Sequence, residues 1–176
     1  TETIQFRADT STGFVELNPE ITLGTVGVVS IENFDSTTVG QLPTGYTQTS
    51  GKSAANWQVV ASSLGSSPSA VATQSAAFGS NAAILVSPTF SEITTYTTLE
   101  FDHSYTLEDG YNGGVLEISI GNGPWVDWLV AGGTFEQNGY DGKTYSSVTL
   151  NDVPTINPVG GNRDVWTGQS GGSVKT

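Results

Sequence analysis

The sequence predicts an all-β protein, specifically a jelly-roll β-sandwich with an N-terminal β extension. Short apolar or alternating runs recur at fairly even spacing, and turn residues separate them. The apolar spacing of an amphipathic helix is missing from nearly the whole sequence. Charged residues make up only 12%, and Gly, Ser, Thr and Asn take their place, a composition typical of turn-rich β-proteins.

Residues 1–24 are expected to form an extension or linker outside the sandwich, which would occupy residues 25–176. Two short β-like pieces lie in this opening, residues 4–8 and 13–17, and Pro19 ends the second. A length of 176 residues suits one domain with such an additional arm.

The strands of the sandwich follow in order, and the stretch 97–130 is the centre of the prediction. Strands are expected at residues 25–34, 56–60, 82–88, 99–105, 115–120, 124–130 and 145–150. The turn Gly121-Asn122-Gly123 joins two of them as a hairpin. Residues 40–51, 62–80 and 131–142 are expected to be loops because small and turn-forming residues dominate them.

The charge of the chain limits its partners. The formal net charge is −12 with only five Lys and Arg, which argues against binding to nucleic acid or to anionic membranes. No run of apolar residues is long enough for membrane insertion, and no cysteine is present for disulfides or thiolate chemistry. The absence of methionine fits a processed chain or a fragment of a larger protein. Composition favours an extracellular or cell-surface location.

Acidic side chains in turns suggest a calcium site. Glu108 and Asp109 lie in a glycine-rich loop, and Glu32 and Asp35 bracket the end of an expected strand. Oxygen ligands on flexible loops suit Ca²⁺. If the two places meet at one end of the sandwich, Glu32, Asp35, Glu108 and Asp109 are the expected ligands, with Glu117 in reserve. The alternative is a set of scattered, solvated carboxylates.

The sequence is poor in catalytic groups, so no enzymatic activity is expected. His103 is the only histidine, and its position on the apolar parity of a strand favours a structural role. Glu100 and Asp102 share a strand face, as in the paired carboxylates of jelly-roll glucanases, but Tyr105 stands where the third carboxylate would be. A glycosidase is therefore the weaker alternative.

Tryptophans offer a second kind of binding site. Indole rings stack on sugars, but they also fill the cores of sandwiches. Trp125, Trp128 and Trp166 are the candidate ligand-binding residues, and Trp57 is a further possibility. Trp125 and Trp128 are an odd interval apart, so on a regular strand only one of them would enter the core.

A series of short motifs between residues 31 and 172 resembles the cleaved-adhesin-like jelly-roll modules of bacterial surface and secreted proteins, which are distantly similar to MAM domains. The motifs are Glu32-Asn33-Phe34-Asp35, Leu42-Pro43-Thr44-Gly45-Tyr46, Trp57, Leu85-Val86-Ser87-Pro88, Leu99 to His103, Glu108, Asn112-Gly113-Gly114-Val115-Leu116-Glu117-Ile118-Ser119 and Trp166-Thr167-Gly168 with Ser170-Gly171-Gly172. The resemblance implies a non-catalytic adhesion or binding module, often stabilised by calcium, with a cell-surface ligand or glycan as partner. Asn112 stands where an aspartate is common.

The resemblance also implies further strands after Gly172, and this raises the prospect of strand donation between chains. A sandwich that lacks a strand exposes an apolar groove and an unpaired edge. The segment around Ile4, Phe6 and Ala8 is a ready strand that could fill the groove of a neighbouring copy and build a filament. Alternatively, residues 1–24 complete their own sheet, or the chain is trimmed.

Overall fold

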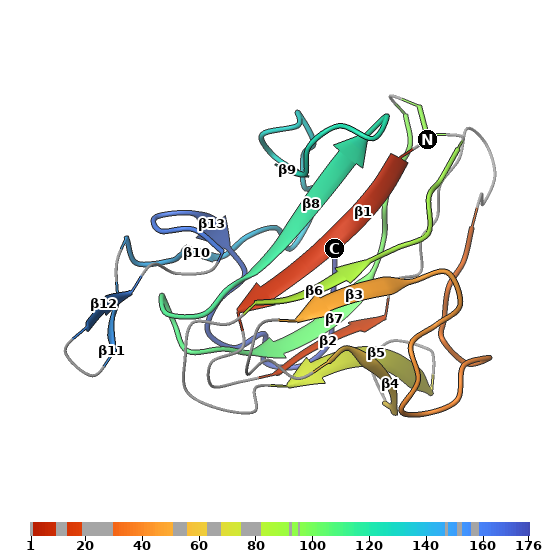
Figure 1. Cartoon of the computed structure of the whole chain (residues 1–176), viewed down its shortest axis with the longest axis horizontal. Helices are drawn as coiled ribbons and strands as arrows, with labels where there is room; N and C mark the ends of the chain where they lie inside the picture. Colours follow the sequence, from red (N-terminus) through yellow and green to blue (C-terminus); the bar gives the residue numbers. More distant parts are fainter. Residues whose placement is uncertain are drawn as a thin grey trace.

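The computed structural model describes residues 2–9, 14–18, 30–50, 56–62, 68–74, 82–91, 93–94, 96–146, 148–150, 153–155 and 159–176. Every regular element in these ranges is a β-strand. Two five-stranded antiparallel sheets pack against each other, which confirms the all-β sandwich (Figure 1). No helix in the described ranges has the length and hydropathy needed to span a membrane.

The two sheets exchange strands repeatedly along the chain. The first sheet has the spatial order β3 (Thr47–Ser50), β6 (Ala82–Val86), β1 (Glu2–Asp9), β8 (Gly114–Ile120) and β9 (Val126–Asp127). The second has the order β14 (Val174–Lys175), β7 (Asp102–Thr106), β2 (Phe14–Asn18), β5 (Ser69–Gln74) and β4 (Gln58–Ala61). Two small ladders pair β10 (Gly142–Lys143) with β13 (Asp164–Val165) and β11 (Val148–Leu150) with β12 (Val153–Thr155).

The N-terminal segments lie at the centre of the sandwich, which differs from the expected extension at residues 1–24. β1 is hydrogen-bonded between β6 and β8, with Phe6 opposite Leu85 on one side and Leu116 on the other. β2 lies between β5 and β7 (Figure 1). The alternating pattern that made residues 4–8 a candidate donor strand suits a central strand equally well, because Phe6 enters the core with 4% exposure.

The backbone of Ile4 and Ala8, the other two residues expected to be donated, pairs within the same chain. Ile4 lies opposite Ile118, and Ala8 lies opposite Ala83 and Gly114. The first sheet therefore receives this strand from its own N-terminus.

The remaining predicted strands agree with the structure where apolar alternation is strong. β4, β6, β7 and β8 overlap segments predicted as strands, and the short strands β9 and β11 lie within the predicted strands 124–130 and 145–150. Of the predicted strand 25–34, residues 25–29 lie outside the described residues, and residues 30–34 are not a strand. Phe34 has a φ of 62° in a turn there, and its ring is fully buried. β3 and β5 lie in segments predicted as loops.

Candidate binding groove

A groove of about 820 Å³, which we call the edge groove, opens among the described residues. It lies between β8 of the first sheet and the segment that leads into β7 of the second. Its volume is in the range of ligand sites. It is lined by Ile93, Thr94, Tyr96 to Phe101, Leu116, Ile118, Ile120, Trp128, Ala131 to Gln137 and Thr176.

One wall of the edge groove is the inner face of β8. Leu116, Ile118 and Ile120 share this face because alternate residues of a strand point the same way. Leu116 and Ile118 are 2% and 7% exposed, but Ile120 is 57% exposed. The apolar face of β8 therefore continues beyond the part that the sandwich covers.

A second wall is the loop after β9, which Trp128 holds in place. The Trp128 indole Nε1 donates to the Thr134 carbonyl at 3.2 Å, and the Gly133 amide donates to the Trp128 carbonyl at 2.9 Å. A side chain at position 133 would overlap the indole, since a Cβ there would lie 2.1 Å from its ring. Farther along, the Asn138 side-chain Nδ2 donates to the Lys175 carbonyl at 2.7 Å, which ties the loop to β14.

The charged residues in the lining are both acidic. Glu100 accepts a hydrogen bond from the Lys175 ammonium at 2.9 Å. Glu136 is exposed in the opposite loop. Tyr96, with 82% exposure, adds an aromatic ring at the rim.

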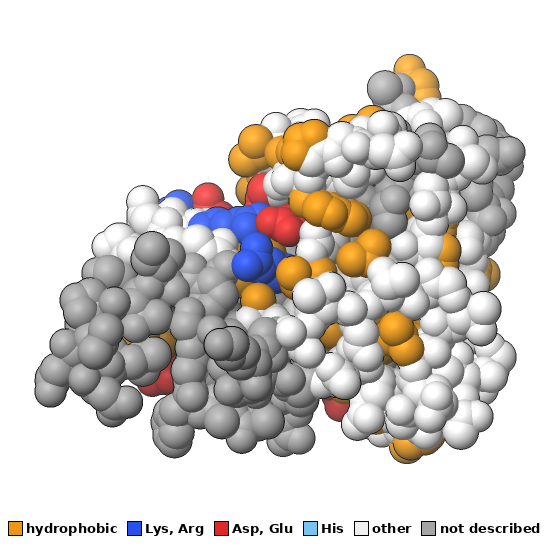
Figure 2. Space-filling view, in the orientation of Figure 1, with side chains coloured by type: hydrophobic (Ala, Val, Ile, Leu, Met, Phe, Trp, Pro, Cys, Tyr) orange, Lys and Arg blue, Asp and Glu red, His pale blue; other side chains and the backbone are white. Residues whose placement is uncertain are grey.

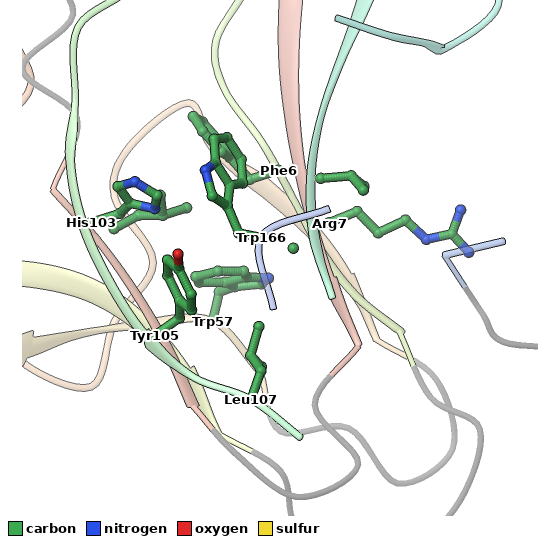
Figure 3. Close-up of a pocket in the computed structure, with 10 residues that line it drawn as sticks. Phe6, Arg7, Trp57, His103, Tyr105, Leu107 and Trp166 are labelled. Atoms are coloured by element: carbon green, nitrogen blue, oxygen red, sulfur yellow. The ribbon is translucent and has the colours of Figure 1, made fainter. Parts of the chain in front are cut away.

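His103 is buried, as expected from its place on the apolar face of a strand. Its ring is 2% exposed and makes edge contacts with Phe101 and Trp166, at centroid distances of 5.1 and 4.8 Å. Its Nε2 lies 2.9 Å from the Thr176 hydroxyl. Burial lowers the pKa of His103 to about 4. Figure 3 shows His103, Tyr105, Trp57 and Trp166 around a cavity of about 20 Å³, which is the size of a water molecule and too small for an organic ligand.

This burial predicts a pH-dependent stability. The unfolded chain binds a proton at His103 near pH 6.5, whereas the folded chain binds it only near pH 4. The contribution of His103 to the free energy of unfolding is therefore complete above pH 6.5 and is lost as the pH drops toward 4. Between pH 7 and pH 5 we expect a loss of about 2 kcal/mol in the free energy of unfolding. Urea denaturation across this range measures it.

The control for this prediction is His103→Phe, which keeps an aromatic ring in the cluster. Because the chain has a single histidine, the variant should show a nearly flat stability between pH 7 and pH 5. If the free energy of unfolding changes with pH equally in the variant and the parent, the pH dependence comes from groups other than His103.

The structure does not gather the predicted calcium ligands. Among the described residues no group of three or more His, Cys, Asp or Glu side chains is placed to hold a metal ion. Glu32 accepts a hydrogen bond from the Phe34 amide at 2.7 Å, and Asp35 accepts one from the Asn33 side chain at 3.1 Å. Glu108 and Asp109 are exposed in the turn before β8. Calcium binding remains a prediction from the sequence.

Glu117, the reserve ligand, belongs to an ion-pair network that the sequence analysis missed. Arg163 donates to Glu117 at 2.9 Å and to Asp127 at 2.7 Å, and the Tyr140 hydroxyl donates to Asp127 at 3.2 Å. Burial disfavours the charged guanidinium, but hydrogen bonds and charges from Asp127 and Glu117 outweigh it and raise the pKa of Arg163. Figure 2 shows Lys and Arg side chains beside Asp and Glu over β8 and β13.

A signal for this network existed in the sequence. Glu117 and Asp127 lie on opposite sides of the predicted hairpin turn, and they are directly paired across β8 and β9. Two carboxylates at such a position repel unless a cation joins them. The chain has only five Lys and Arg residues, so few side chains could supply that cation.

The tryptophans separate into buried and exposed residues. Trp166 and Trp57 are 4% and 1% exposed, so neither has a free face for a ligand, which corrects the prediction for Trp166. Trp128 packs against the core and lines the edge groove, whereas Trp125 is 39% exposed and lies outside it. The expectation that only one of Trp125 and Trp128 would reach the core is confirmed.

Comparisons with protein-family models, with curated proteins and with solved structures find no match for this chain. The fold and the groove define its class as a β-sandwich with an open apolar groove at one edge.

Proposed function

We propose that this protein is a non-catalytic, extracellular binding module and that the edge groove is its ligand site. The observation that carries the proposal is the groove itself. It combines an apolar wall on β8, the aromatic residues Tyr96, Trp128 and Phe135, and polar groups at its rim. Ligand sites commonly have this make-up of apolar surface and a few polar groups.

The arrangement of the ionisable groups supports binding rather than catalysis. The His103 ring is enclosed by aromatic side chains and is hydrogen-bonded to Thr176. Glu117 and Asp127 are each engaged by Arg163. Glu100 lines the groove but is paired with Lys175. A general acid or base needs a proton it can exchange with a ligand, and none of these groups is free for that role.

A glycan is the second candidate ligand, because aromatic rings beside acidic and hydroxyl groups suit sugar recognition. Filament formation by strand donation has less support, since β1 is paired on both sides within its own chain.

The experiment compares Tyr96→Ala with Trp125→Ala on a glycan array and a peptide array. Both residues are exposed aromatics, but only Tyr96 lines the groove. We expect Tyr96→Ala to weaken binding about tenfold, or about 1.4 kcal/mol, and Trp125→Ala to bind like the parent. An equal loss of binding in both variants would show that the ligand site lies outside the edge groove.

A polysaccharide hydrolysis assay tests the catalytic alternative. We expect no release of reducing sugar. Hydrolysis that disappears in Glu100→Gln would contradict the proposal and favour a glycosidase with Glu100 as a catalytic carboxylate.

A further inference from the structure

We propose that the turns on either side of β9 dock on the surface of an electrically neutral lipid bilayer through a small apolar rim. The rim consists of Trp125, Leu129 and Val130, which are 39%, 41% and 77% exposed. None of the three lines the edge groove, so this inference goes beyond the proposed function and does not depend on it. It is carried by the exposure of these side chains, the fixed backbone beneath them, the charges around them and the size of the rim.

The rim lies at the edge of the first sheet, where β9 is the last strand (Figure 1). Figure 2 shows hydrophobic side chains gathered around β9 at the margin of the molecule. Three of the large apolar side chains that are exposed in the described part of the chain belong to the single stretch 125–130. Isolated apolar side chains are ordinary on a protein surface, whereas a group of them marks a contact with another protein or with lipid.

Hydrogen bonds fix the backbone on both sides of the rim. In the hairpin turn before it, the Ser119 hydroxyl donates to the Gly123 carbonyl at 2.8 Å. In the turn that follows β9, the Leu129 amide donates to Asp127 Oδ1 at 2.9 Å, and the Ala131 amide donates to the Asp127 carbonyl at 2.8 Å. Side chains on such a fixed backbone remain exposed, and docking them does not require a loop to become ordered.

The charges around the rim disfavour an anionic lipid surface. Asp127 is the only charged residue in the stretch 118–135. Arg163 contacts Asp127 but is shared with Glu117, so this group combines one positive charge with two negative ones. The whole chain carries a formal charge of −12. A zwitterionic headgroup layer is therefore the lipid surface that the rim can approach without repulsion.

The size of the rim favours lipid over a protein partner. A standard protein interface covers about 800 Å² and roughly 20 to 30 residues on each partner. The rim has three large apolar side chains, and the segments next to it are rich in glycine, at positions 121, 123, 132 and 133. A lipid interface requires less surface, because aliphatic side chains enter the acyl boundary while an indole lies among the headgroups.

The test is cosedimentation of the protein with vesicles of pure phosphatidylcholine, with tryptophan fluorescence as a second measurement. We expect reversible binding at millimolar lipid and a blue shift of the emission, because Trp125 leaves water. Vesicles of equal parts phosphatidylcholine and phosphatidylserine should bind about fivefold more weakly, since their surface repels an acidic protein. Added salt should reduce this difference by screening the repulsion.

The matched variants are Val130→Glu and Val39→Glu. Val39 is 61% exposed, and it lies beside Gly40, whose amide donates to the Val59 carbonyl of β4 in the second sheet. Val130→Glu should weaken binding to phosphatidylcholine about tenfold, and Val39→Glu should leave it within about twofold of the parent. Trp125→Ala should weaken binding and remove the emission shift. Circular dichroism of each variant checks that it is folded.

The inference would be overturned by an absence of binding to phosphatidylcholine at millimolar lipid, or by tighter binding to the vesicles that contain phosphatidylserine. An equal loss in Val130→Glu and Val39→Glu would also reject it. Concentration-dependent self-association of the protein that Val130→Glu abolishes would assign the rim to a protein interface instead. Because no rim residue lines the edge groove, each of these results leaves the proposed function to be decided by its own experiments.

Discussion

Replacing Trp166 by alanine should lower the free energy of unfolding by about 4 kcal/mol, because removal of a buried indole costs transfer energy and leaves a cavity. The Trp166 ring contacts Phe101, His103, Phe135 and Tyr140, at centroid distances of 5.9, 4.8, 5.5 and 4.7 Å. Its Nε1 also donates to the Asn138 carbonyl at 3.0 Å. Urea denaturation followed by circular dichroism measures the loss.

Trp125→Ala is the matched control for this effect. Its ring is 39% exposed, and substitutions at such positions usually change stability by less than about 0.5 kcal/mol. A loss below about 1 kcal/mol in Trp166→Ala would mean that the cluster around the indole is not a tightly packed core.

Replacing Arg163 by methionine should destabilise the protein by about 2 to 3 kcal/mol. Removing one partner of a buried ion pair leaves uncompensated charge, and here two carboxylates lose the same cation. The Arg163 side chain keeps 21% exposure, so solvent screening reduces the effect below that of a fully buried pair. Lys143→Met, which removes an ion pair exposed by more than half on both sides, should cost less than about 1 kcal/mol.

The Arg163→Met variant should also respond differently to pH. Without the guanidinium, the charges of Glu117 and Asp127 would repel each other across β8 and β9. Acid relieves repulsion between two carboxylates, so the deficit of the variant relative to the parent should shrink as the pH falls from 7 to 4.5. Adding Glu117→Gln should recover part of the loss at pH 7. A deficit independent of pH would point to lost packing of the Arg163 stem instead.

The sequence predicts those elements whose signal is local. Alternation around Phe101, His103 and Tyr105 marks the start of β7, and the apolar run from Val115 marks β8. β5 escaped prediction because its residues, Ser69–Gln74, include no large apolar side chain, and its neighbours β2 and β4 hold it in place. Strand order is not a local property either, so nothing near Phe6 showed that β1 lies between β6 and β8.

The edge groove could be foreseen only in part. Trp128 was a candidate from its residue type, but the wall that it faces comes from Ile118 and Ile120, which read as ordinary strand residues. Trp166 lies in a glycine-rich segment without a regular alternation, so its burial could not be derived from parity. A groove built from separate segments leaves no periodic signature in any of them.

The central positions of β1 and β2 have a consequence for biosynthesis. Phe6 pairs with Leu85 and Leu116, and Leu17 pairs with Val71 and His103, so both strands must wait for partners made much later. At a translation rate of about 5 to 20 residues per second, roughly 5 to 20 s pass between synthesis of β1 and completion of β8. Until β5 and β6 have been made, both edges of β1 and β2 are unpaired, and neither sheet can be completed before its later strands emerge. Folding is therefore expected to be a late and collective event on the nascent chain.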